Sequence, residues 1–187
     1  SLATCFDSTG KLTYKPNNLG TYSNTFSNAA WAKSSAGTGT TPALTANTGT
    51  DPFGGNDSWR LQLDIAAGTA VGDVSWMYNN ISAVPQKTVN SIYIKSNTGS
   101  SQDVLFTDYN LTVQTVVTVT TSWQRFNVNV AATGDGGLLI GVRGSLATVK
   151  TADLLIAFAQ TEAVTYETSP RTYNATTSAA YYGPRFD

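Results

Sequence analysis

Histidine is missing from this chain of 187 residues, and cysteine occurs once, as Cys5. Without histidine, Ser-His-Asp catalysis, Cys-His catalysis and histidine-ligated zinc are excluded. One cysteine cannot form a disulfide within the chain, so packing, sheet pairing or association with other subunits must stabilise the fold. Because no imidazole is present to generate a thiolate, we interpret Cys5 as an ordinary small residue.

Charged residues are also scarce, at 12% of the chain against about a quarter in typical soluble domains. Eleven basic residues nearly balance twelve acidic ones, and they do not cluster into the basic surface that nucleic acid binding requires. No run of about eighteen apolar residues is present, so we expect no membrane span. A surface rich in hydroxyls and amides is typical of extracellular or virion proteins.

The chain also begins without a charged segment followed by an apolar one, so no signal peptide is predicted. Its first residue is Ser1, which indicates processing or a fragment.

Apolar and polar residues alternate along most of the chain, which is typical of β-strands with one buried face. In residues 58–65 this alternation separates two faces: Trp59, Leu61, Leu63 and Ile65 on one, and Arg60, Gln62 and Asp64 on the other. The same pattern covers residues 74–80, 89–96, 103–109, 112–120 and 122–130.

Two continuous apolar stretches, residues 137–142 and 154–159, are short and rich in β-forming residues. We interpret them as central strands buried on both faces. The only helical feature expected is a turn around Asn28–Lys33. About eight to ten strands at regular spacing predict an all-β fold, a jelly-roll type two-sheet β-sandwich with extended terminal arms.

The predicted boundaries are faint and divide the chain into three parts. Residues 1–17 form an N-terminal arm or hairpin around the turn cluster at 7–11, and residues 18–162 form the sandwich. Residues 163–187 lose the alternation and gain Pro170 and Pro184, so we expect an extended C-terminal tail on a surface.

Segments at both ends of the predicted sandwich carry a family resemblance. Residues 18–34, with Phe26 and Trp31, and residues 159–187, which open with AQTEA, resemble the opening and closing segments of a jelly-roll domain. This domain is common in phage tail and other virion structural proteins and is often described as carbohydrate-binding-module-like. Residues 51–64, 91–100 and 122–130 resemble its intervening units in the same order. The resemblance implies that Leu19, Phe26 and Trp31 are apolar plugs at the sandwich edge.

Sugar-binding relatives of this fold often hold a structural calcium ion with a Glu after the first Phe and an Asp in the last strand. Ser27 and Ala157 stand at these positions here, and neither has a carboxylate. This departure from the family pattern makes that calcium site doubtful. Asp51 and Asp57, which flank a glycine-rich turn, are the alternative candidates for an ion. Turn formation by these two aspartates is the other interpretation.

Enzymatic activity is not expected. A glycosidase would need two carboxylates about 5–10 Å apart across a cleft. Asp64 with Asp73, or Asp103 with Asp108, could form such a pair, but no spacing in the sequence singles them out.

Sugar binding needs exposed aromatic faces for the CH groups, with amides and charged groups to fix the hydroxyls. Side chains predicted to face outward supply the candidates. They are Trp76, Tyr78, Tyr93, Tyr109, Trp123 and Arg125. The same aromatics could instead lie in the core or at subunit contacts.

The resemblance, together with these patterns, implies two candidate functions. The favoured one is a non-enzymatic phage virion structural protein, such as a tail fibre, head fibre or decoration subunit, that assembles through its termini. Its expected location is the surface of the phage particle, its partners are other virion subunits, and the resemblance favours a homotrimer. The alternative is a receptor-binding module that recognises host cell-surface glycans through the exposed aromatics.

Overall fold

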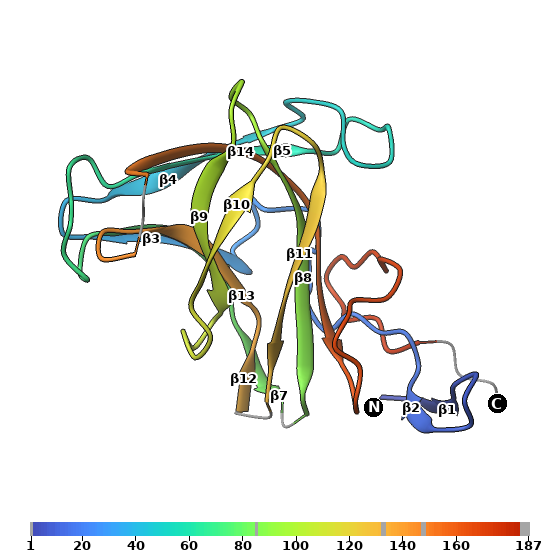
Figure 1. The fold of residues 1–187 in the computed structure, drawn as a ribbon. Helices are drawn as coiled ribbons and strands as arrows, with labels where there is room; N and C mark the ends of the chain where they lie inside the picture. Colours follow the sequence, from blue (N-terminus) through green and yellow to red (C-terminus); the bar gives the residue numbers. More distant parts are fainter. Residues whose placement is uncertain (1, 85, 132–133, 147–148, 184–187) are drawn as a thin grey trace.

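A computed structural model describes residues 2–84, 86–131, 134–146 and 149–183, and these residues form strands and turns without a helix (Figure 1). No helix of membrane-spanning length therefore occurs in these ranges. The all-β prediction is confirmed. The described strands are β1 (Thr4–Phe6), β2 (Leu12–Tyr14), β3 (Trp31–Ala36), β4 (Thr40–Ala46), β5 (Trp59–Asp64), β6 (Val74–Asn79), β7 (Ile81–Val84), β8 (Thr88–Ser96), β9 (Gln102–Asp108), β10 (Thr115–Val119), β11 (Gln124–Val130), β12 (Gly134–Gly136), β13 (Leu138–Arg143) and β14 (Thr151–Ala163).

Ten of these strands form two five-stranded sheets that pack face to face, which confirms the predicted jelly-roll type sandwich (Figure 1). Sheet 1 has the order β10-β9-β13-β6-β3, and sheet 2 has the order β11-β8-β14-β5-β4. Neighbouring strands are antiparallel in both sheets. The two continuous apolar stretches become β13 and β14, each the middle strand of its sheet.

The core lies between the sheets and follows the period-two pattern. In sheet 2, Ile92 and Ile94 of β8 are fully buried, and in sheet 1 Met77 of β6 is fully buried. Phe26 and Trp31 close one end of this core with ring centroids 4.8 Å apart in an edge-to-face arrangement. Burial of such large side chains is the main favourable term that holds the two sheets together.

The N-terminal part of the sandwich differs from the expected pattern. Residues 18–30 form bends and turns, and the extended strand begins only at Trp31, within the segment where a turn was expected. Asn24 lies in this segment, and its Oδ1 accepts a hydrogen bond from the distant Phe158 N–H at 2.8 Å. Tertiary contacts therefore override the local turn chemistry here. The sequence pattern also did not indicate β4 and the short strands β7 and β12.

Strand β14 contains a bulge between Ala157 and Gln160, where its register against β8 shifts. Phe158 occupies this bulge with φ +54°, a left-handed backbone conformation that non-glycine residues adopt rarely. Its ring lies 5.0 Å from the ring of Tyr173 and 5.2 Å from that of Phe53. The bulge therefore turns an aromatic side chain out of the core and onto the outer face of sheet 2.

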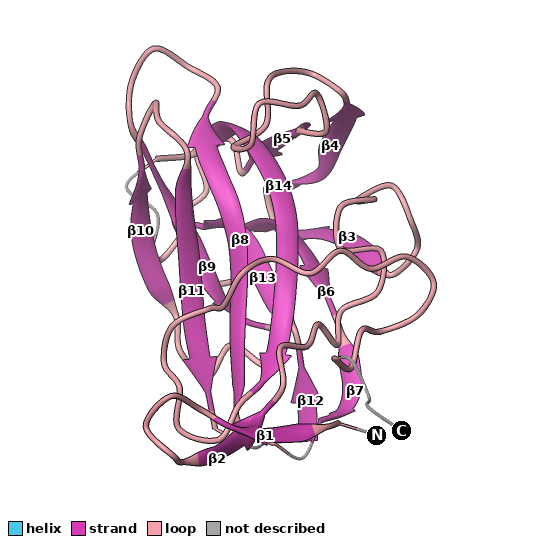
Figure 2. Ribbon diagram, turned by 90° about the vertical axis from the view of Figure 1, so that its right-hand side faces the viewer, coloured by secondary structure: helices cyan, strands magenta, loops and turns pink. Residues whose placement is uncertain are grey.

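In the C-terminal segment, residues 168–174 lie on that outer face and cross in front of β11, β8 and β14 (Figure 2). Side chains of the sheet hold its backbone. The Arg125 guanidinium donates to the carbonyl of Arg171 at 2.6 Å, and Gln160 Oε1 accepts from the N–H of Asn174 at 2.7 Å. This part of sheet 2 is therefore covered by the chain's own tail.

Residues 1–17 contain the hairpin of β1 and β2, which lies beside the start of the tail (Figure 1). Its anchor is the Glu167 carboxylate, which accepts hydrogen bonds from the Thr13 hydroxyl and from Arg171. Burial acts to raise the pKa of Glu167, but these hydrogen bonds and those from backbone N–H groups outweigh it and lower the pKa to about 2. The hairpin is therefore tied to the tail by an ionised carboxylate.

This anchor predicts acid release of the hairpin. Because the pKa of Glu167 falls from 4.5 to about 2 on folding, its stabilising effect is complete above about pH 4.5 and is lost as the pH falls towards 2. Hydrogen exchange of the β1 and β2 amides should quicken in that window more than exchange in β8. In Glu167→Gln the extra loss across the window should shrink to the part due to Asp7, whose pKa is lowered by the hydrogen bond from Tyr166 of the tail. Equal pH dependence in the two proteins would contradict the assignment.

Candidate functional site

Sheet 1 has an outer face that carries three aromatic side chains in one groove. Trp76 and Tyr78 are two residues apart in β6, so they share a face, while Met77 between them points into the core. Tyr109 follows the end of β9, and its ring lies 5.4 Å from that of Tyr78 at an interplanar angle of 44°. The structure thus brings three of the six predicted sugar-contact residues together.

The absence of a side chain at Gly141 makes room for this arrangement. Gly141 of β13 pairs directly with Trp76 of β6. A Cβ atom at position 141 would lie 2.4 Å from the Cβ of Trp76 and 2.7 Å from the carbonyl oxygen of Ser75. Only glycine allows this close approach without a shift of the backbone.

The groove has a volume of about 370 Å³ and a mixed lining without a charged side chain. Sequence reasoning missed four of its residues: Ser34, Asn110, Leu111 and Leu139. Within the described chain, Trp76 Nε1 and the hydroxyls of Tyr78 and Tyr109 make no hydrogen bond to another described residue. These groups are therefore available to an incoming polar ligand. Asn110 directly follows Tyr109, the aromatic residue at the end of a predicted strand. This position is the one signal in the sequence that could have identified Asn110 as a groove residue.

The other three predicted sugar-contact residues lie on sheet 2, on the opposite side of the sandwich. The Arg125 guanidinium stands 5.2 Å from the centre of the Tyr93 ring and donates to the tail. Trp123 Nε1 donates to the carbonyl of Thr50 at 3.0 Å, and Phe53 of the same loop packs against Tyr93. These side chains bind the chain's own loop and tail, so the predicted set does not form one site.

Asp51 organises the loop that joins β4 to β5. Its carboxylate oxygens accept hydrogen bonds from the N–H groups of Phe53 at 2.8 Å and Asp57 at 3.2 Å, and its side chain is buried. An ion at Asp51 and Asp57 would compete with these donors for the same oxygens. No group of three or more acidic or cysteine ligands that could hold a metal occurs among the described residues. Ion binding by Asp51 and Asp57 stays a prediction.

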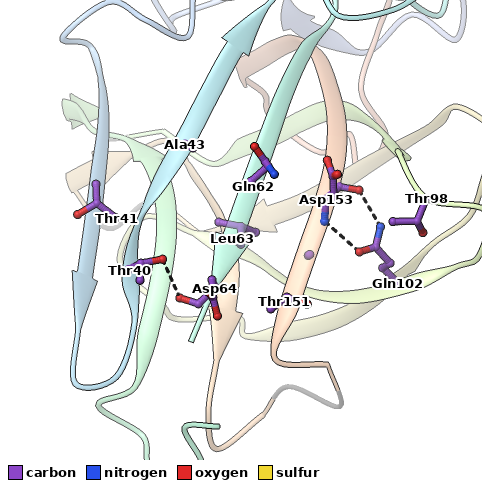
Figure 3. A pocket seen from close by; sticks show the side chains of 11 residues that line it. Thr40, Thr41, Ala43, Gln62, Leu63, Asp64, Thr98, Gln102, Thr151 and Asp153 are labelled. Atoms are coloured by element: carbon purple, nitrogen blue, oxygen red, sulfur yellow. Dashed lines mark hydrogen bonds between the residues drawn. The ribbon is translucent and has the colours of Figure 1, made fainter. Parts of the chain in front are cut away.

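A second hollow of about 430 Å³ lies beside β4, β5 and β14 (Figure 3). Its polar groups are largely engaged with one another. Gln102 Nε2 donates to the carbonyl of Asp153, and Gln102 Oε1 accepts from the Asp153 N–H. The Asp153 carboxylate is paired with Arg60 at 2.6 Å. The lining contains no aromatic ring on which a sugar could stack.

The carboxylates considered for catalysis are separated or engaged. Asp103 and Asp108 are five residues apart on β9, about 17 Å at the rise of an extended strand, and they face opposite sides of the sheet. Asp73 accepts hydrogen bonds from the N–H groups of Thr38 and Ala70, which lower its pKa. The separation of Asp103 and Asp108 exceeds that of a glycosidase pair, and the Asp73 carboxylate is engaged by backbone N–H groups.

No protein-family model and no curated protein matches the sequence. The family 11 carbohydrate-binding module from Clostridium thermocellum is similar in structure, with a TM-score of 0.48, 10% identity, and coverage of 73% of this chain and 90% of that chain. An exo-β-agarase is similar with a TM-score of 0.53 and 9% identity, and the match covers 79% of this chain and 25% of the agarase chain. Tailspike protein 4 of bacteriophage CBA120 has a TM-score of 0.43 and 12% identity, and the match covers 77% of this chain and 20% of the tailspike chain.

At 9% identity, the likeness to the agarase shows the fold alone. The chain spans a quarter of the agarase and a fifth of the tailspike, so their activities do not transfer with the fold.

The close approach at Gly141 gives a direct test of the groove's construction. Gly141→Ala should destabilise the fold by about 1–3 kcal/mol, because the new methyl group has no room against Trp76 and the neighbouring strand. Urea unfolding measures this change. Gly99→Ala is the matched control, since a Cβ there meets nothing within 4 Å, and it should change stability by less than about 0.5 kcal/mol. Equal effects in both variants would contradict the packing described.

Proposed function

We propose that this protein binds carbohydrate without catalysing a reaction, and that the sheet 1 groove holds a single glycan chain. The observation that carries the proposal is the grouping of Trp76, Tyr78 and Tyr109 in one uncovered groove. Aromatic faces accept the CH groups of a sugar ring, while hydroxyls and amides such as those of Ser34 and Asn110 pair with its hydroxyls.

The shape and charge of the groove narrow the ligand class. The 44° angle between the rings of Tyr78 and Tyr109 suits a twisted single chain better than the flat surface of a crystalline polysaccharide. The lining has no charged side chain that would pair with a uronate or sulfate group. A soluble, neutral glycan, for example on a host cell surface, is therefore the ligand that we propose.

Binding should depend on the groove and not on sheet 2. In Trp76→Ala or Tyr78→Ala, affinity should fall by about thirtyfold or more, the loss typical of a buried aromatic contact. Affinity electrophoresis and calorimetry would test linear and side-branched pairs: xylan and arabinoxylan, mannan and galactomannan, and mixed-linked β-glucan and xyloglucan.

Phe53→Ala is the matched control, because Phe53 is an aromatic residue 66% exposed on the opposite sheet. It should leave affinity unchanged. Loss of binding in Phe53→Ala with none in Trp76→Ala would place the site on sheet 2. Absence of binding to every polysaccharide and to bacterial surface glycans would refute the proposal.

A second function, that of a phage virion subunit on the particle surface, is favoured by the apolar end of the molecule. Phe6 and Leu12 are cross-strand partners in the hairpin and are 73% and 55% exposed. Tyr166, whose hydroxyl donates to Asp7 beside them, is also exposed. An exposed apolar cluster of this kind is typical of a contact surface for another subunit, and we propose a homotrimer or a contact with a different virion protein.

Self-association through this end is testable with the whole chain. Phe6→Ser combined with Leu12→Ser should reduce the mass of the assembly measured by size exclusion with light scattering, because it removes the exposed apolar pair. Val113→Ser combined with Val116→Ser, at exposed positions just before β10 and within it, is the control and should leave the mass of the assembly unchanged. A wild-type chain that is monomeric at all concentrations and binds no virion protein would rule this function out.

A further inference from the structure

One wall of the groove is formed by a residue in an unfavourable backbone conformation. Leu111 lines the groove and has φ +59°, in the left-handed region. A leucine in this region carries strain of about 1 kcal/mol or more, which glycine would avoid. Residues that break a local rule in this way are concentrated at functional sites. The retention of a leucine side chain here calls for a reason outside backbone stability.

Asp108 holds Leu111 in this conformation from inside the loop. Its side chain is 1% exposed, and its Oδ1 accepts hydrogen bonds from the N–H groups of Thr112 at 2.8 Å and Val113 at 3.0 Å. Its Oδ2 accepts from the N–H of Asn110 at 3.1 Å. One buried carboxylate thus fixes the backbone on both sides of Leu111.

Three further hydrogen bonds brace the same loop from its two flanks. On one side, the Asn110 side-chain amide donates to the carbonyl of Asp135 at 3.0 Å. On the other, Arg143 donates to Gln114 Oε1 at 2.7 Å, and Gln114 Nε2 donates to the carbonyl of Leu111 at 3.3 Å. The loop is therefore held in place before any ligand arrives.

We propose that residues 109–114 are a preformed wall of the glycan groove, with Leu111 as the specificity-determining contact and Asp108 as its positioning residue. This inference rests on the proposed function of the groove. A wall that is already ordered binds without the entropic cost of fixing a loop. Because Leu111 is fixed beside Tyr109, it packs on an unbranched chain and collides with a side branch at the same point. The ligand class is thereby narrowed to linear neutral glycans.

Leu111→Gly separates recognition from stability. The variant relieves the left-handed strain, so its melting temperature should stay the same or rise. Affinity for the linear polysaccharides xylan, mannan and mixed-linked β-glucan should fall about tenfold. This loss corresponds to the binding free energy of one or two buried methylene groups. The preference for linear over branched chains should shrink towards unity.

Ala66→Gly is the matched control, because Ala66 also has a left-handed φ, of +49°, but is exposed in the turn after β5 and does not line the groove. Ala66→Gly should change the melting temperature as Leu111→Gly does, and it should leave the affinities for linear and for branched polysaccharides unchanged.

Asp108→Asn tests the positioning role. Hydrogen exchange of the amides of Asn110, Thr112 and Val113 should quicken, and affinity for the linear chain should fall about tenfold as the wall loosens. Asp51→Asn should loosen its own loop on the opposite sheet and leave affinity unchanged, which excludes a general effect of removing a buried carboxylate.

The possible results distinguish the inference from the function beneath it. Unchanged affinity and unchanged linear preference in Leu111→Gly, with binding lost in Trp76→Ala, would overturn the inference and leave the groove as the binding site. A wild-type chain that binds none of these polysaccharides would overturn both. If Leu111→Gly reduces both the affinity and the preference for linear chains without loss of stability, the result would support the proposal that residues 109–114 form a wall of the groove.

Discussion

The docking of the C-terminal segment on sheet 2 determines which surface of this sandwich is open to a ligand. Two packed sheets have two outer faces, and both carry aromatic side chains here. On sheet 2, Arg125 and Gln160 use their polar groups to bind the backbone of the tail, and Phe158 and Tyr93 pack against Phe53. The described part of the tail, up to Gly183, leaves the aromatic groove on sheet 1 uncovered, and the functional account follows from that difference.

Three local features build the groove: the alternation of side chains along a strand, a glycine on the neighbouring strand and a buried carboxylate in a loop. Strand alternation places Trp76 and Tyr78 on one face, and Gly141 on the neighbouring strand leaves room beside the indole. The buried Asp108 carboxylate then fixes the loop that carries Tyr109 and Leu111. None of these features requires a ligand to form, so the site is preorganised by the fold itself.

The sequence predicted the sandwich, the two middle strands and the outward direction of Trp76 and Arg125, because period two in apolar residues fixes which side chains share a face. It could not predict that these two residues lie on opposite sheets, since alternation within a strand carries no information on strand order. The bends and turns before Trp31 were also not predicted. Their conformation depends on distant partners, such as the N–H of Phe158 for Asn24, that a local pattern does not contain.

The most direct test of the central claim is a titration of the 15N-labelled protein with soluble glycan, followed by NMR. The chain has four tryptophans, so their indole N–H resonances report separately on the core, on sheet 2 and on the groove. The account predicts that the indole resonance of Trp76 shifts together with the amides of Tyr78 and of residues 109–113, while that of Trp123 stays in place. Shifts at Trp123 and Tyr93 with an unchanged Trp76 would contradict it.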